Sequence, residues 1–383
     1  MAQEAPASPR KMARHGRLRI TVYRGLAGLD ALADSWRALV SRLERPAYVH
    51  FWEWHRSYLE ADVHDPERVI FCAVFAGQQA VAILPLVRAD KRLCGLHLRL
   101  LGLPLDPLTL HADIIVDPRV QAEFELMPIL QALRGDLGEP WDVVRLGLVL
   151  EDSIANAVVG GLQGGLRGAM IESEQLDVSN ALEIAPYDEM LARFSKNLRS
   201  SLRNSRNKLA KLESVTLHQA RTPDELEAAF PLLLSVEASG WKGKAGTAIS
   251  SKPQSHDMYE GFVRQFGAIG RCRIDLLMHG ERPMAGQLSL AVGDRLYAFK
   301  IGYDESYSQE APGRMLLEQV LRSLSAEPGI RFLDLISNQA WHHGWRAIQR
   351  PVHMHYLCRT GPMGVLFWLF AYARRLWRGM LRS

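Results

Sequence analysis

The stretch from residue 271 to residue 336 constrains the fold more strongly than any other part of the chain. It contains three β-like runs, at Arg271–His279, Pro283–Val292 and Arg295–Tyr303. Gly280-Glu281 and Gly293-Asp294 separate these runs, and short glycine-containing turns between apolar runs are hairpin signals. The sequence therefore predicts three consecutive antiparallel strands.

A helix and a further strand follow these three runs. From Gly313 to Ser325 the apolar residues have helical spacing, and Gly329 ends that stretch. Ile330–Ile336 is a short apolar run, which suits a parallel strand reached through a crossover helix. The predicted order is three antiparallel strands, a helix and a strand.

The first half of the chain repeats this order loosely. Its predicted elements are strands at Val69–Phe75, Ala80–Arg88, Leu96–Leu103, His111–Val116 and Trp141–Leu150, and a helix at Val120–Leu133. We therefore predict an α/β (α+β) protein of two divergent copies of one unit, each a mixed β-sheet flanked by helices. The predicted boundaries are 1–17 for a basic disordered N-terminus, 18–175 and 176–360 for the units, and 361–383 for a basic amphipathic tail helix.

The composition narrows the class of protein. With 383 residues, 48% of them hydrophobic and 23% charged, the chain resembles a folded protein of about two domains. No apolar run reaches the roughly 18–20 residues that a membrane-spanning helix needs. The four cysteines have no CxxC spacing, and the N-terminus lacks the apolar stretch of a secretory signal. We therefore expect a cytoplasmic protein.

Basic residues are concentrated at the two ends of the chain. The first nineteen residues carry five Lys or Arg against one acid, and the chain after Asp334 carries seven Arg and no acid. The remainder holds 34 basic and 41 acidic residues. Basic ends on an acidic body indicate a local anionic contact, such as a membrane surface, rather than a coat for nucleic acid.

The C-terminal segment is the main candidate for that contact. Met363–Ala373 is almost wholly apolar but too short to span a bilayer. One predicted helical stripe is apolar and a second is basic: Leu366, Phe370, Ala373, Trp377 and Leu381, and Arg374, Arg378 and Arg382. The pattern describes a helix in a membrane interface, or alternatively a terminal helix packed on the protein's own core.

A second basic segment lies between the two predicted units. Lys196–Leu212 has leucines on one helical face and six Lys or Arg on the rest. This pattern is typical of a solvated basic helix. It also suits contact with the phosphates of an acyl carrier, a lipid or an RNA.

These segments together resemble a known family. The second half is similar to the acetyltransferase domain of the CelD/BcsL group, a branch of the GNAT superfamily related to the Fem peptidyltransferases. The matching stretches are FSKNLRSSLRNSRNKLAKL at 194–212, EASGWKGKAGT at 237–247, GQLSL at 286–290 and LYAFKIGYDESYSQEAPGRMLL at 296–317. The first half resembles the companion domain through Trp36, Phe51–Trp54, ILPL at 83–86 and His111–Asp113. The resemblance covers roughly residues 18–345. It implies tandem GNAT-like units and N-acyl transfer from a thioester, usually acyl-CoA.

The resemblance places the acyl donor at Gly313. Backbone N–H groups at a helix N-terminus suit a pyrophosphate, and Gly313 has no Cβ to block close approach. Pro312 suits a helix start and Arg314 adds a cation. Gln309 and Met315 complete the expected CoA-binding set, although a single glycine departs from the fuller signature Q/R-x-x-G-x-G/A. The first half offers no such glycine before its helix, so we expect it to have lost donor binding.

Amine acylation by direct attack needs a base for the ammonium proton and an acid for the leaving thiolate. Asp304 and Glu237 are the candidate bases, since Asp304 follows the third strand and Glu237 lies in a matching stretch. Tyr303 is the candidate acid, with Tyr307 as an alternative, because a phenol with a pKa near 10 can protonate a thiolate. Asp334 either orients the amine or caps a neighbouring backbone.

Substrate contacts are expected at Trp241, Lys242, Gln287 and Lys300, and at the pair His342 and His343. Many relatives have a Tyr-Lys pair at the two histidines, so either the acceptor differs from that of Fem enzymes or the loop has diverged. Adjacent histidines alternate faces on a strand, so we expect no metal. Three of the cysteines are expected in the core rather than as nucleophiles: Cys72, Cys94 and Cys272.

The sequence therefore predicts an acyl-CoA-dependent N-acyltransferase, peripheral on the inner face of the cytoplasmic membrane. The leading acceptor is an amino group of an envelope or exopolysaccharide precursor, small or lipid-linked. The alternatives, in order, are a long-chain lipid amine, Fem-like aminoacyl transfer from tRNA, and a non-catalytic binding module. An acyl carrier protein is an alternative carrier for the donor, and nucleic acid is not an expected partner.

Overall fold

The computed structural model describes residues 11–15, 18–62, 65–93, 95–162, 169–239, 249 and 252–380. The strands are β1 (Lys11–His15), β2 (Leu18–Arg24), β3 (Val69–Ala76), β4 (Gln79–Leu93), β5 (Leu96–Gly102), β6 (Ile115–Val116), β7 (Val143–Leu150), β8 (Ala169–Glu183), β9 (Val215–Ala220), β10 (Cys272–His279), β11 (Arg282–Val292), β12 (Arg295–Tyr303), β13 (Phe332–Asp334) and β14 (Ile348–Arg359).

The α-helices are α1 (Gly25–Ala31), α2 (Ala33–Val40), α3 (Trp52–Glu60), α4 (Leu126–Arg134), α5 (Ile154–Leu162), α6 (Tyr187–Arg193), α7 (Lys196–Leu209), α8 (Pro223–Ser239), α10 (Pro253–Ala268), α11 (Pro312–Ala326) and α12 (Pro362–Met380). Short 3-10 helices lie at η1 (Tyr48–His50), η2 (Pro66–Arg68), η3 (Gln121–Glu123), η5 (Glu305–Glu310) and η6 (Ala340–Trp345). No helix among the residues described is both long enough and apolar enough to cross a membrane.

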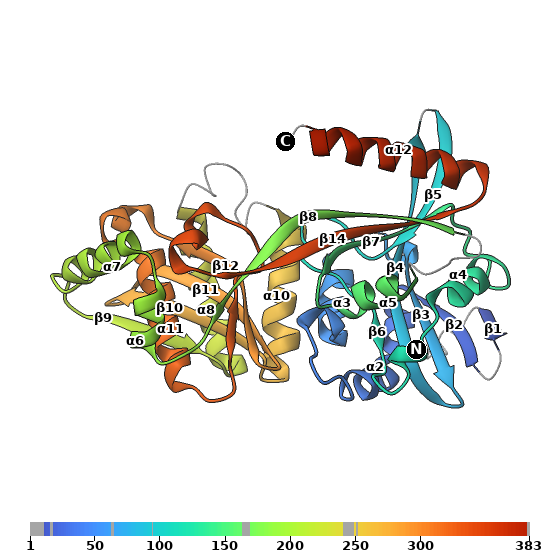
Figure 1. Cartoon of the computed structure of the whole chain (residues 1–383). Coiled ribbons are helices and arrows are strands. Elements are labelled where there is room, and N and C mark those ends of the chain that lie inside the picture. The colour runs from blue at the N-terminus through green and yellow to red at the C-terminus, as the bar shows by residue number, and fades with distance from the viewer. Residues whose placement is uncertain are drawn as a thin grey trace, which may run out of the picture.

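The strands form one mixed sheet that runs through two lobes (Figure 1). Its order is β1-β2-β3-β4-β5-β7-β14-β8-β13-β12-β11-β10-β9, and β6 pairs with β4. Helices flank the sheet in both lobes, so the predicted α/β class with mixed sheets and flanking helices is confirmed.

The two lobes share a long two-stranded ribbon. β8 and β14 run from one lobe to the other (Figure 1), and β14 pairs with β7 on one side and with β8 on the other. β14 therefore lies in the second unit by sequence but pairs with β7 of the first unit. The boundary expected at 175/176 falls inside β8.

The antiparallel strands and crossover helix of the second unit are confirmed almost as predicted. β10, β11, β12 and α11 lie within one or two residues of their expected ends. β13 is shorter than the run Ile330–Ile336, because Ile336 adopts a φ of 59° and turns the chain out of the sheet.

Three local predictions were wrong. Residues 11–15 form the edge strand β1 rather than part of a disordered terminus. The helix expected from Val120 begins only at Leu126, because Pro128 lacks an N–H and is tolerated only in the first turn. Of the strand expected at His111–Val116 only β6 forms, because Asp113 instead accepts the N–H groups of Ile154 and Ala155 at the start of α5.

A single apolar core joins the two units. The buried cluster includes Trp36 and Phe71 from the first unit and Phe262 and Phe299 from the second. Tyr48 lies at their junction, with its ring edge-on to Phe299 at 4.7 Å between centroids. The contact between the units is therefore core packing, and the first unit supports the strands of the second.

The expected core cysteines are buried where the structure describes them. Burial raises the pKa of Cys72 to about 12 and that of Cys272 to about 12, so both thiols stay protonated at neutral pH. Cys94 lies outside the described residues.

Replacement of Phe262 tests the shared core. Phe262→Ala should lower the free energy of unfolding by about 3–5 kcal/mol, because Phe262 is fully buried and its loss leaves a cavity. Denaturant unfolding followed by tryptophan fluorescence and by circular dichroism should give one coincident transition, displaced to lower denaturant. Ile269→Ala, at a residue 42% exposed, is the control and should change stability by no more than about 0.5 kcal/mol. Two separated transitions in the native protein would contradict a shared core.

Candidate functional site

The second unit contains a pocket of about 830 Å³ beside β12. β12 pairs with the parallel β13 over only three residues, Arg295–Tyr297 against Phe332–Asp334, and the two strands then separate. The space beyond the last pair is the pocket. Its walls come from α7, α8, β12, η5, the start of α11, the loop after β13 and η6: Leu198, Glu237, Ala298, Phe299, Ile301, Gly302, Tyr303, Ser308, Ala311, Pro312, Gly313, Arg314, Leu335, Ser337, Gln339, Trp341, His342 and Trp345.

One end of the pocket is the N-terminus of α11. Ala311 has a left-handed backbone, with φ 53°, and directs the chain into the helix, where Pro312 occupies the first position. Pro312 has no N–H, and the N–H groups of Arg314 and Met315 donate to Ala311 O at 3.0 and 3.1 Å, so the N–H of Gly313 is the one that this first turn offers to a ligand. A Cβ built on Gly313 would meet only the ring of Tyr303, at 3.4 Å. Packing does not require glycine there, whereas close approach of a ligand to the backbone would require it.

Two members of the expected donor set do not reach this end. Met315 is buried in the core between α11 and the sheet, so its side chain is structural. Gln309 is exposed, and its carbonyl oxygen accepts a hydrogen bond from Lys208 Nζ at 2.9 Å. Pro312, Gly313 and Arg314 do line the pocket.

Glu237 is the buried carboxylate of the pocket. It lies on α8 with an exposed fraction of 1%, and its Oε2 accepts the backbone N–H of Ile249 at 2.6 Å. Lys300 Nζ lies 3.9 Å from Oε1 and 5.1 Å from the centre of the Tyr259 ring. Burial, together with the nearby Glu237 charge, raises the pKa of Tyr259, which keeps that phenol neutral.

Gly302 allows Glu237 to reach the pocket. A Cβ on Gly302 would lie 2.8 Å from the Glu237 Cα, a separation that no real side chain tolerates. The absence of a side chain lets α8 pack directly on β12. The position of the carboxylate is therefore set by backbone contact.

The structure separates the two candidate bases. Asp304 lies outside the pocket lining, where it caps η5 by accepting the N–H of Ser306 at 2.9 Å and pairs with Arg282 at 2.6 Å. Burial alone would raise the pKa of Asp304, but the contacts with Ser306 and Arg282 lower it overall. An anion held in this way has a structural role, which leaves Glu237 as the candidate base.

Tyr303 is the phenol that borders the pocket, beside Gly313. The alternative, Tyr307, turns away, and its hydroxyl lies 3.0 Å from His279 Nδ1. The sequence predicts both residues near the donor. In the structure they differ, because Tyr303 lines the pocket whereas Tyr307 contacts His279.

Four further expected site residues either bind within the protein or lie outside the described residues. Asp334 is fully buried and binds Arg350 at 2.6 Å and the N–H of Ile336 at 2.9 Å, so it caps the turn after β13. Gln287 is buried in the sheet and donates to Ser289 Oγ. Trp241 and Lys242 fall outside the described residues.

The histidine pair is divided between the pocket and the solvent. Both residues lie on η6 rather than on a strand, which corrects the expectation of alternating strand faces. His343 is exposed, whereas His342 has an exposed fraction of 1% and lines the pocket.

The tautomer of His342 follows from its contacts. Its Nδ1 accepts the backbone N–H of Gln339 at 3.2 Å and lies 3.1 Å from Asn180 Nδ2. A nitrogen that accepts a backbone N–H carries no proton, so the proton of the neutral ring is on Nε2. Burial lowers the pKa of His342 to about 4. At neutral pH the ring is therefore an N–H donor beside the pocket and not a base.

Aromatic residues that the sequence did not single out as site residues line the end of the pocket near His342. Trp341 is 47% exposed and stands edge-on to the His342 ring at 4.1 Å, and Trp345 is buried. Asn180, which orients His342, is a buried polar residue on β8. The WHHGW motif indicated this loop as part of the site. It could not indicate that Asn180 orients His342, because pairing between strands that are distant in sequence brings the two residues together.

The corresponding region of the first unit is filled by side chains. β5 pairs with the parallel β7 over three residues, from Leu100 to Gly102. Beyond the pairing Leu103 is buried, and a Cβ on Gly147 would lie 2.6 Å from the Met354 side chain. Side chains therefore occupy the space beside this strand pair, and the expected loss of donor binding stays a prediction.

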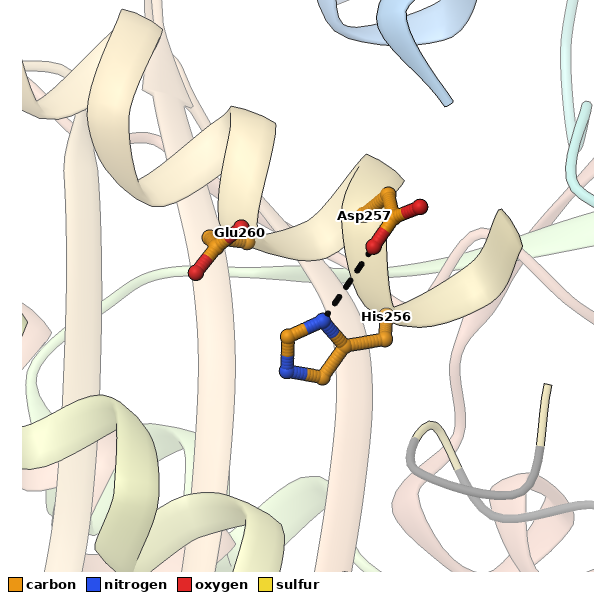
Figure 2. Close-up of side chains that lie close together, drawn as sticks. All are labelled: His256, Asp257 and Glu260. Carbon is orange, nitrogen blue, oxygen red and sulfur yellow. Dashed lines mark hydrogen bonds and ion pairs between the residues drawn. The ribbon is translucent and has the colours of Figure 1, made fainter. Parts of the chain in front are cut away.

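A cluster of possible metal ligands lies on the surface of α10, away from the pocket lining. His256, Asp257 and Glu260 place their ligand atoms within 4.8 Å of one another, and His256 Nδ1 lies 3.4 Å from Asp257 Oδ1 (Figure 2). All three come from one helix, and the two carboxylates are exposed. We assign no cation to the cluster, because solvated acidic groups of this kind are common.

Solved structures with a similar fold support this description of the two units. The chain is similar to FemX, with a TM-score of 0.55 and 12% identity over 88% of this chain and 98% of that one. It is also similar to the C-terminal domain of a putative lysylphosphatidylglycerol synthetase from Agrobacterium fabrum, with a TM-score of 0.52 and 10% identity over 89% of this chain and 96% of that one. These likenesses concern the fold alone. A comparison with curated proteins gives no match.

A family model matches part of the second unit. Residues 196–342 match the family model described as an acetyltransferase (GNAT) domain. The chain therefore contains a GNAT-type acetyltransferase domain, and this domain includes α7, α8, β10 to β13, α11 and the start of η6.

The state of His342 can be measured without a substrate. Nitrogen-15 spectra of histidine-labelled protein at about pH 5.5 should show a neutral ring protonated on Nε2, and His342→Gln should remove that signal. Because the folded pKa lies below the unfolded value of about 6.5, the unfolded chain takes up the proton first. His342 therefore costs stability as the pH falls from about 6.5 towards 4. His343→Gln is the control. A cationic ring, or a ring protonated on Nδ1, would contradict the assigned hydrogen bonds.

Proposed function

We propose that the protein is an N-acyltransferase that moves an acyl group from acyl-CoA to an amine of an envelope or exopolysaccharide precursor. The observation that carries the proposal is the pocket between the N-terminus of α11 and the buried Glu237. The non-catalytic alternative loses support, since Gly313 borders an open pocket.

The donor end fits an anionic carrier. Gly313 leaves the first turn of α11 open to a ligand, and the dipole of α11 favours negative charge at that end. Arg314 is exposed beside it. These residues would hold the pyrophosphate of CoA, whose thioester supplies the activated acyl group. An acyl carrier protein, whose donor arm also carries a phosphate, remains the second carrier proposed for the same residues.

The catalytic roles follow from position and charge. Glu237 takes the proton of the ammonium group, directly or through water, and Lys300 Nζ lies 3.9 Å from its Oε1. The amine nitrogen then attacks the thioester carbonyl carbon and the C–S bond breaks. Tyr303, beside Gly313, gives its proton to the leaving thiolate and regains one from the acylated nitrogen. His342 Nε2–H donates to an oxygen of the acceptor and holds the amine in place.

The acceptor end favours a hydroxylated amine. Trp341 and Trp345 offer aromatic surface, and Ser337, Gln339 and His342 offer hydrogen bonds beside it. Aromatic rings together with polar groups suit an amino sugar, and this agrees with the acceptor that the CelD/BcsL resemblance implies. The family assignment at this level is part of the proposal.

We rank two other acceptors below this one. A long-chain lipid amine is second, because the exposed apolar face of α12 would bring the enzyme to its substrate. Aminoacyl transfer from tRNA is third, supported by the basic surface of α7 alone. We propose that the enzyme works at the inner face of the cytoplasmic membrane.

Substitution of Gly313 tests the donor site. Gly313→Val should abolish CoA binding measured by calorimetry, because the branched side chain would occupy the first turn of α11. The fold should survive, since the new Cβ meets only the flexible Tyr303 ring. Gly160→Val on α5, where a Cβ meets nothing within 4 Å, is the matched control. Normal CoA affinity in Gly313→Val would refute the assignment of the donor site.

Substitution of Glu237 tests the base. Glu237→Gln should lower the rate of thiol release from acetyl-CoA with glucosamine as acceptor by about 10²–10⁴-fold. Donor affinity should stay the same, because Glu237 lies on α8 rather than at the α11 terminus. Asp304→Asn is the matched control and should retain most of the activity. A reversed result, with Asp304→Asn inactive and Glu237→Gln active, would show that the base is misassigned.

A further inference from the structure

The helix α12 leaves one side uncovered. Of the eight large apolar side chains that are most exposed in the described part of the chain, five lie on it: Leu369 at 51%, Phe370 at 48%, Tyr372 at 37%, Leu376 at 50% and Trp377 at 60%. We call these five residues the outer face. An apolar group of this size on one helix marks an interaction surface.

The opposite side of α12 is packed on the protein. Ala371 is buried in a cluster with Leu98, Leu100, Val143 and Met354, and Met363, Phe367 and Trp368 pack against it. The alternative of a terminal helix packed on the protein's own core therefore holds for this side of α12. The outer face is held in a fixed orientation, across the end of the first lobe (Figure 1).

Two of the tail arginines do not serve as free cations. Arg374 pairs with Glu174, and Arg375 pairs with Glu172 at 2.8 Å, both on β8. The sequence had suggested that these arginines meet anionic lipid. The ion pairs instead hold α12 on the β8–β14 ribbon and reduce the positive charge at the outer face.

We propose that the outer face of α12 docks on an anionic lipid bilayer, chiefly by insertion of Phe370 and Trp377 below the headgroups. Aromatic rings with a polar atom, as in Tyr372 and Trp377, favour the interfacial depth of a bilayer. The fold itself forms the outer face, so this proposal does not depend on the chemistry proposed for the pocket.

The charge beside the outer face favours a bilayer over a second copy of the chain. The β4–β5 hairpin packs against α12 through Leu98 and carries the exposed cations Lys91 and Arg92. Asp90 on the same hairpin pairs with His97 at 3.2 Å. A symmetric dimer through α12 would bring two such basic hairpins to one interface, whereas an anionic surface attracts both cations.

Vesicle binding tests the docking surface in the full chain. Vesicles of phosphatidylglycerol and phosphatidylcholine in equal parts should co-sediment the protein. The double variant Phe370→Ser with Trp377→Ser should lower the partition coefficient by about 10–100-fold, because two half-exposed rings lose their burial in lipid. Ile269→Ser, which removes an exposed apolar side chain outside α12, is the control and should bind as the native protein does. Circular dichroism checks that each variant is folded.

The ion pairs give a second and independent measurement. Since insertion is the main contribution, binding of the native protein should fall by less than about 10-fold between low and high salt. Glu172→Gln with Glu174→Gln frees Arg374 and Arg375, and should raise binding at low salt and steepen its salt dependence. Brominated lipid should quench tryptophan emission, and Trp377→Phe should reduce that quenching while keeping the binding.

Three results would overturn the proposal. The first is a native protein that stays in the supernatant at both salts. The second is full binding by the Phe370 and Trp377 double variant. The third is concentration-dependent dimerisation that the same double variant abolishes while vesicle binding is absent, since this would assign the outer face to a second copy of the chain.

Discussion

The site depends on the early end of one parallel strand pair. β12 and β13 hold each other for three residues and then separate, because Ile336 turns the chain out of the sheet. The separation leaves a pocket bordered by five of the last six residues of β12. It also brings three distant elements to that edge: the start of α11 with Gly313, α8 with Glu237, and η6 with His342. A longer pairing would close the pocket.

The first unit fixes this geometry without lining the pocket. Its aromatic residues share a core with the strands and helices behind the site, as the contact of Tyr48 with Phe299 shows. The β8–β14 ribbon also positions two residues of the second unit. Asn180 on β8 orients His342, and Arg350 on β14 holds Asp334. The same ribbon carries α12, so one element connects the pocket to the proposed lipid-facing surface.

The sequence could predict the parts that depend on local pattern. The runs of β10 to β12 and the helix after Gly313 follow from periodicity and turn residues, and Gly313, which the sequence singles out, does line the pocket. Side-chain roles were less predictable, because they depend on long-range partners. Asp304 and Glu237 look equivalent in sequence, yet a neighbouring Arg282 and Ser306 bind one while Gly302 admits the other to the pocket. Met315 has helical spacing consistent with either face of α11, and only packing shows that it is core.

Hydrogen exchange with mass spectrometry, with and without acetyl-CoA, tests the central claim most directly. Donor binding should slow exchange in residues 298–303 of β12 and at Gly313 in the first turn of α11, because the ligand would cover backbone N–H groups that border the pocket. Residues 100–105 in the first unit, where side chains fill the equivalent space, should exchange at an unchanged rate. Protection of residues 100–105 instead, or CoA binding without protection at β12 and α11, would contradict the account.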